Sequence, residues 1–247
     1  MSKNIIVGNQ KGGVGKTTTA VNLGHGLALQ GKKVLLIDLD PQGQCAVLLN
    51  QKQENNIVRL LITKDNPKGL IRETGRDNLF FIPGDRDTSI AQLALQNKPI
   101  NELYTALDPI QAKYDYIIFD TAPSLGDLQA QAIWAADLLL IPTACDFLSS
   151  EGVIKFLETA KGVRELHKAE HKLLGILPTF YDTTTKETKA VIDDLEKNFN
   201  NSVMDPIHRA TVLRECAAYG KTIFEIEPGG RAAQEYQAVV DLTLEEK

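Results

Sequence analysis

A glycine-rich segment with two lysines lies near the N-terminus, where residues 10–18 read QKGGVGKTT. It follows a short apolar run at residues 5–7 and precedes a stretch of helical spacing, which is the context of a phosphate-binding loop. Glycines let the backbone curl with its N–H groups pointing inward, and the following helix adds the positive end of its dipole. In such a loop Lys16 can reach the β- and γ-phosphates of a nucleotide, and the Thr17 hydroxyl can ligate Mg²⁺. The segment therefore predicts nucleotide binding.

This loop departs from the usual G-x-x-x-x-G-K-[ST] pattern at its first position and carries an additional lysine. Gln10 stands where the first glycine is expected, and a second lysine, Lys11, follows it. A solvated loop cation is the plain alternative for Lys11. Its place beside the glycines favours a role with phosphates, because phosphoryl transfer needs added positive charge in the transition state.

Aspartates end two of the apolar runs. Asp38 follows residues 34–37, and Asp120 follows residues 116–119 in the arrangement of a Walker B segment. Asp120 is expected to hold Mg²⁺, directly or through water. Asp38 can orient an attacking water; a strand-end cap or an indirect contact with Mg²⁺ are the alternatives. Asp40 either joins this site or only shapes the turn before Pro41.

Six short apolar runs predict strands buried on both faces, as in a parallel sheet. They cover residues 5–7, 34–37, 79–82, 116–119, 138–141 and 173–177, and residues 16–30 have helical spacing before Gly31. Alternating strands and helices predict an α/β fold with a doubly wound, mostly parallel sheet and ligands at the carboxyl ends of the strands. No linker divides the chain, so residues 1–247 are expected to form a single domain, with residues 50–76 as an irregular insertion or peripheral helix.

Composition excludes several classes of protein. The chain has 247 residues, 43% hydrophobic and 24% charged, with a net charge of −5. This excludes disordered and collagen-like chains, and it disfavours a uniformly basic nucleic-acid coat but not a local basic patch. Cys45, Cys145 and Cys216 lack C-x-x-C spacing, which favours buried thiols in a reducing, cytoplasmic setting. No apolar stretch is long enough to cross a membrane.

Residues 11–18 resemble the deviant Walker A loop of the ParA/Soj/MinD superfamily of partition and positioning ATPases. The resemblance continues through DLDPQG at residues 38–43, DTAPS at 120–124, YGK at 219–221 and a final helix at 230–240. The DLDPQG segment and PTFYD at residues 178–182 are most similar to small ParA/Soj proteins. The resemblance implies a P-loop NTPase fold, ATP and Mg²⁺ as ligands, and slow ATP hydrolysis stimulated by a partner.

The resemblance also assigns roles to residues. It implies a homodimer that sandwiches ATP, with Lys11 crossing to the partner subunit's nucleotide. Lys11, Lys16 and Asp38 take part in catalysis, Asp38 orienting the water, and Thr17 and Asp120 hold the metal, Asp120 through water. The ATP-binding set is Lys11, Gly12, Gly13, Val14, Gly15, Lys16, Thr17 and Thr18.

Such proteins couple ATP binding to attachment on a scaffold. For the ParA/Soj branch the resemblance implies nonspecific double-stranded DNA, hence a nucleoid-associated location in the ATP state. Basic residues that can contact DNA are Lys186, Lys189, Arg209, Arg214 and Arg231, although interspersed acidic residues equally suit an ordinary charged surface. An adaptor would connect the ATPase to its cargo: a plasmid, a chromosome origin or a protein body such as a carboxysome. The larger relatives' helix-turn-helix extension is expected to be absent.

Three other functions remain open. A MinD-like ATPase binds membrane through a basic amphipathic C-terminal helix, but the last residues here, LTLEEK, are acidic. A P-loop metal-cluster carrier would need closely paired cysteines. A structural module would bind ATP without turnover. His167 and His171, spaced i, i+4, lack the glutamate of a metalloprotease motif, so a solvated helix face is expected for them.

Overall fold

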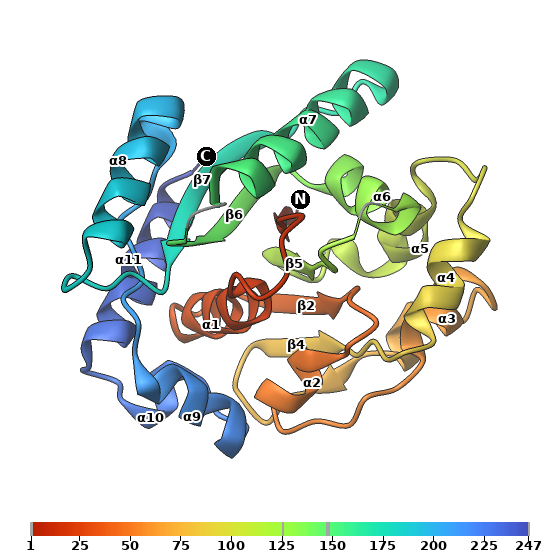
Figure 1. Ribbon diagram of the computed structural model, residues 1–247. Helices are drawn as coiled ribbons and strands as arrows, with labels where there is room; N and C mark the ends of the chain where they lie inside the picture. The colour runs from red at the N-terminus through yellow and green to blue at the C-terminus, as the bar shows by residue number, and fades with distance from the viewer. Residues whose placement is uncertain (1, 125, 147–148, 247) are drawn as a thin grey trace.

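A mostly parallel β-sheet forms the centre of the computed structural model, which describes residues 2–124, 126–146 and 149–246 (Figure 1). Within these ranges the sheet has seven strands in the order β3-β4-β2-β5-β1-β6-β7, and only β3 pairs antiparallel. The strands are β1 Lys3–Val7, β2 Val34–Asp38, β3 Arg72–Glu73, β4 Leu79–Ile82, β5 Tyr116–Asp120, β6 Leu138–Ala144 and β7 Lys172–Thr179. The expected α/β fold with a doubly wound, mostly parallel sheet is confirmed.

Apolar side chains leave the strands alternately to the two faces of the sheet. Ile6 and Ile37 enter one hydrophobic cluster, whereas Ile5, Val7 and Leu36 enter a second cluster on the opposite face. Successive strand residues point to opposite sides, so an uninterrupted apolar run supplies both cores at once.

Helices cover both faces. Residues of α3 Asn56–Leu61, α4 Thr88–Ala94, α5 Glu102–Gln111, α6 Asp127–Ala135, α7 Ser149–His167 and α8 Lys186–Phe199 enter the cluster that contains Ile6. Residues of α1 Lys16–Leu29, α2 Gln44–Leu48, α9 Thr211–Tyr219, α10 Ile223–Ile226 and α11 Arg231–Glu245 enter the other. The 3₁₀ turns are η1 Pro67–Gly69 and η2 Asn200–Ser202.

Strand pairing brings the chemically important segments to one edge of the sheet. β5 lies between β1 and β2, and the register pairs Asp38 with Asp120. The same register places Val7, the last residue of β1 before the glycine-rich loop, beside Asp120. The carboxyl ends of three neighbouring parallel strands therefore meet where an α/β sheet places its ligands.

The polar stretch at residues 50–76, expected to be an irregular insertion or a peripheral helix, contains a helix together with other regular structure. It holds α3, η1 and the two-residue strand β3. The sequence does not reveal β3, because two polar residues, one half-buried and one exposed, give no alternation pattern.

Gly84 approaches the end of β2 closely, and this contact tests how rigidly Asp38 is held. A Cβ at Gly84 would lie 2.4 Å from the backbone oxygen of Asp38. We expect Gly84→Ala to lower the free energy of unfolding by about 2 kcal/mol in urea titrations, because the backbone must shift. Gly162→Ala is the control: its Cβ meets nothing within 4 Å. It should be neutral or stabilise α7 by about 0.5–1 kcal/mol. Equal values for the two variants would contradict the close contact.

Candidate active site

The glycine-rich loop forms the wall of a cavity at the start of α1. Gly13 and Gly15 have φ angles of 72° and 85°, a left-handed conformation that glycine adopts without strain. Gly15 is the N-cap of α1, and it provides no side-chain hydrogen bond to the first turn of the helix. The N–H groups of that turn are thus available to an anion. The cavity has a volume of about 390 Å³, and its lining includes Gly12, Gly13, Gly15, Lys16, Thr17, Thr18, Asp40, Pro123 and Phe180.

Lys16 is held at the inner side of this loop. Its side chain is buried, and Nζ donates to the backbone oxygen of Lys11 at 3.0 Å. Burial lowers the pKa of Lys16, while the charges of Asp120 and Asp40 oppose that shift. A partly desolvated ammonium group beside free backbone N–H groups suits the phosphates of a nucleotide.

Lys11 points elsewhere, although it belongs to the same loop. Its backbone N–H donates to Asn9 Oδ1 at 2.9 Å, and its Nζ forms an ion pair with Asp146. Lys11 does not line the loop cavity. The structure thus separates the two lysines: Lys16 faces the cavity, and Lys11 contacts a residue that follows β6. Sequence reasoning missed Asp146, because no motif marks it.

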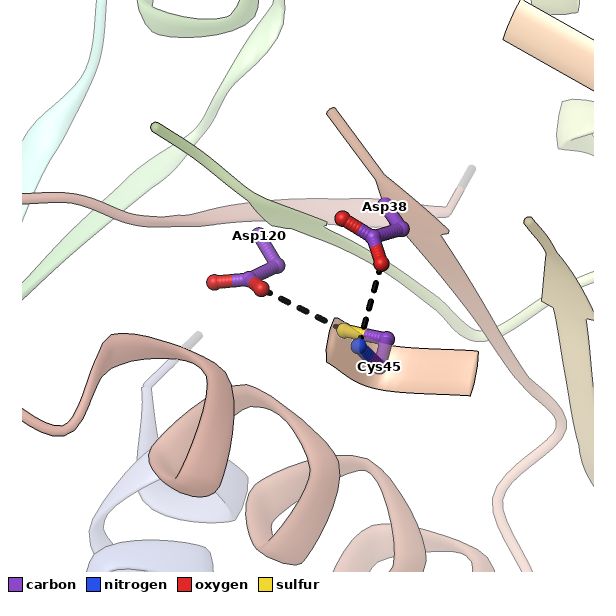
Figure 2. A group of neighbouring side chains, drawn as sticks. All are labelled: Asp38, Cys45 and Asp120. Carbon is purple, nitrogen blue, oxygen red and sulfur yellow. Dashed lines mark hydrogen bonds between the residues drawn. The ribbon is translucent and has the colours of Figure 1, made fainter. Parts of the chain in front are cut away.

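Asp38 and Asp120 lie side by side at the ends of β2 and β5, and both are completely buried. Asp38 Oδ1 accepts from the N–H of Asp40 at 3.1 Å, and Asp38 Oδ2 accepts from the N–H of Cys45 at 3.0 Å. Asp120 Oδ2 accepts from the Cys45 thiol at 3.3 Å (Figure 2). The sequence therefore placed both carboxylates at this edge correctly, but it did not identify Cys45 between them.

Burial and the charge of a neighbouring aspartate perturb both carboxyl groups. Burial, followed by the charge of Asp120, raises the pKa of Asp38 well above its usual range. Burial also raises the pKa of Asp120 to about 6, whereas the side chains of Thr17 and Cys45 act in the opposite direction. Neighbouring buried carboxylates without a cation store unfavourable energy, a common property of functional sites.

One oxygen of this pair fits a cation. Asp120 Oδ1 is buried and accepts no hydrogen bond from the described residues. Oxygen ligands from a carboxylate and a hydroxyl suit Mg²⁺, and Thr17 lies beside Asp120. Asp40 accepts from the N–H of Gln42 at 2.9 Å and also lines the loop cavity, so it shapes the turn and remains near the site.

A second cavity of about 610 Å³ adjoins the first and shares Gly13, Thr18 and Phe180 with it. Arg209 and Arg214, two of the basic residues suggested for DNA, line this second cavity. The Arg209 guanidinium lies 5.8 Å from the centre of the Phe180 ring. The other basic candidates are exposed on different elements: Lys186 and Lys189 on α8, and Arg231 at the start of α11.

The structure also shows the environment of the three cysteines and of the two histidines. Cys45, Cys145 and Cys216 are free and buried, as expected. The expectation of a solvated helix face for the two histidines is wrong for His171. Helix α7 ends at His167, and His171 is buried beyond it, where burial lowers its pKa. The i, i+4 spacing spans the end of the helix, which the sequence alone did not reveal.

The pKa of Asp120 leads to a stability prediction. An unfolded aspartate ionises near pH 4, so the raised folded pKa of about 6 means that folding stability is lost as pH rises from about 4 to 6. Without nucleotide, Asp120→Asn should increase the free energy of unfolding at pH 7.5 by about 1–3 kcal/mol, with the gain disappearing near pH 4. Urea titrations across this pH range test it, with exposed Asp77→Asn as control. A gain independent of pH would contradict the assignment.

Comparisons with known proteins place this site in a family. Residues 2–173 match the family model described as an AAA domain. The chromosome-partitioning ATPase Soj of Treponema pallidum is 36% identical over 240 residues, covering 96% of this chain and 95% of Soj. The apo McdA structure from Cyanothece has a TM-score of 0.91 at 25% identity, covering 98% of this chain and 100% of McdA. Another McdA structure is a variant complex with ATP.

A further solved structure with the same fold contains a bound nucleotide and magnesium. Cobyrinic acid a,c-diamide synthase from Mycobacterium smegmatis, with bound ADP and magnesium, has a TM-score of 0.85 at 29% identity, covering 99% of this chain and 94% of that chain. Among the described residues, no helix has the length and apolarity to span a membrane. With its deviant loop, strand-end aspartates and near-complete match to Soj, the chain belongs to the ParA/Soj family of P-loop ATPases and hydrolyses ATP with Mg²⁺.

Proposed function

We propose that this protein is an ATP-dependent dimerising ATPase that binds double-stranded DNA nonspecifically in its ATP state and positions a cargo through an adaptor protein. The proposal rests mainly on the different positions of the two lysines in the glycine-rich loop. Lys16 is buried at the cavity, whereas Lys11 lies outside it on Asp146. Because Lys11 does not line the cavity of its own subunit, it can contact the nucleotide that is bound to a second subunit.

Each residue of the site has a separate role in binding or hydrolysing ATP. Within the ATP-binding set, the N–H groups of residues 12–18 hold the phosphates together with Lys16 Nζ. Thr17 and Asp120 hold Mg²⁺, which supplies charge neutralisation on the phosphates when bound. Asp38 orients the attacking water: two backbone N–H groups fix its carboxylate at the strand end. Lys11 from the partner adds positive charge as the transition state develops.

Release of Lys11 from its own subunit costs little energy. The side chains of Lys11 and Asp146 are 28% and 48% exposed, so their ion pair is worth about 1 kcal/mol or less. The phosphates of ATP in a partner subunit offer this lysine a denser negative charge. Nucleotide binding can therefore drive the dimerisation.

Substitution of each lysine tests this division. Lys16→Ala should lose ATP binding, because it removes the cation within the cavity. Lys11→Ala should keep some ATP binding, remain monomeric, and lose about 10³-fold or more in turnover, as for an absent arginine finger. Nucleotide titration and analytical ultracentrifugation separate these outcomes. A doubling of mass with ATP in Lys11→Ala would overturn the sandwich dimer.

DNA binding draws on the exposed basic residues. All five candidates are exposed: Lys186 and Lys189 on α8, Arg231 on α11, Arg209 and Arg214. Arg209 and Arg214 also line the second cavity beside the phosphate loop. With a net charge of −5, attraction to DNA must be local. A dimer presents each patch twice, and phosphate contacts then act together.

Attachment to DNA suits this chain better than attachment to membrane. The apolar residues Tyr236, Val239 and Val240 of α11 are buried in the core, and α11 packs on α1. The C-terminal helix is thus committed to the fold rather than presenting an apolar face to lipid. We further propose that residues 1–247 act as one ATPase domain and that an adaptor stimulates its slow hydrolysis. The cargo is a plasmid, a chromosome origin or a protein body such as a carboxysome.

DNA binding should require ATP and weaken steeply with salt, because contacts to phosphates release counterions. The double variant Lys186→Ala/Lys189→Ala should reduce the slope of log Kd against log salt concentration by about 2 for each subunit that contacts DNA. Lys98→Ala/Lys113→Ala, at exposed positions near α5, is the matched control. Fluorescence anisotropy with a random duplex measures both. Equal DNA affinity with ADP and ATP would contradict the switch.

A further inference from the structure

Cys45 is the one residue of the described chain that hydrogen-bonds to both site carboxylates. Gly43, with a φ of 61°, turns the chain into α2 directly after the Asp38 loop. This turn directs Cys45 back toward the strand ends. Its N–H donates to Asp38 Oδ2 and its thiol to Asp120 Oδ2, as the dashed lines of Figure 2 show.

The Cys45 thiol donates a hydrogen bond and also fills space in the hydrophobic core. Cys45 is completely buried in the apolar cluster around Ile5 and Val7. Alanine or valine would satisfy packing alone, whereas cysteine tolerates apolar surroundings and still offers a weak donor.

The thiol bonds to one oxygen of Asp120, and the other oxygen has no hydrogen bond within the described part of the chain. Oδ2 accepts from Cys45, while Oδ1 points away from Cys45 in Figure 2 and accepts no hydrogen bond from the described residues. A carboxylate with one oxygen held and the other unpaired is preorganised for a cation. Residues that hold metal ligands in this way typically contribute 10–100-fold to metal affinity or activity.

We propose that Cys45 is a positioning residue of the ATPase reaction, whose thiol holds Asp120 Oδ2 so that Oδ1 is presented to Mg²⁺, and whose N–H fixes Asp38. This inference rests on the roles proposed above for Asp38 and Asp120. The backbone N–H survives substitution, so a side-chain variant isolates the thiol's effect on Asp120.

The experiment compares Cys45→Ala, Cys45→Val and Cys45→Ser with Cys216→Ala, at a buried cysteine on α9 outside both cavities. ATP turnover is measured against Mg²⁺ concentration, and ATP binding is measured separately in EDTA. The Ala and Val variants should need about tenfold more Mg²⁺ for half-maximal turnover. Serine retains a donor, so Cys45→Ser should stay within about threefold of the wild type. Cys216→Ala should match the wild type, and binding in EDTA should be unchanged throughout.

Two results would overturn the inference: an unaltered Mg²⁺ requirement in both apolar variants, or a serine variant as impaired as alanine, which would indicate packing alone. Thermal unfolding checks each variant. If Cys45→Ala fails to fold, Cys45→Val, which fills the same space without a donor, carries the comparison. Asp120→Ala separates the two levels of the proposal: a normal Mg²⁺ requirement there would refute the metal role of Asp120, whatever Cys45 does.

Discussion

Two buried carboxylates held side by side are the constraint on which the site depends. The register of β2 and β5 pairs Asp38 with Asp120, and both side chains are completely buried. Burial and repulsion make this arrangement unfavourable without a cation. Surrounding groups compensate in part: backbone N–H groups hold Asp38, and the Cys45 thiol holds one oxygen of Asp120. The site is therefore built for a cation and a phosphate rather than for its own stability.

Close backbone packing maintains that arrangement. Gly84 leaves room for the Asp38 carbonyl, and Gly43 turns the chain so that α2 starts beneath the strand ends. Both glycines lie outside the phosphate loop. Gly43 brings α2 close enough for Cys45 to hydrogen-bond to both carboxylates, and Gly84 lets its own loop pack against the backbone of Asp38.

The two lysines of the phosphate loop differ in burial and in their partners. Lys16 is buried and bonded to the loop itself, whereas Lys11 forms a partly exposed ion pair. Exposed ion pairs are weak, so Lys11 can exchange Asp146 for a stronger anion. In the proposed ATP-sandwich dimer, this difference in burial would couple nucleotide binding to the association of subunits.

Local sequence determined much of this protein. The apolar runs specified six of the strands, because buried parallel strands are continuously apolar, and the glycine, lysine and threonine spacing specified the phosphate loop. The strand-end positions of Asp38 and Asp120 followed from the same runs. Tertiary structure alone decided the contacts between distant segments: Cys45 with Asp120, Lys11 with Asp146, Arg209 with Phe180, and the burial of His171. Periodicity records which way a side chain faces, whereas these contacts depend on strand order and on how loops cross the sheet edge, and neither leaves a local pattern in the sequence.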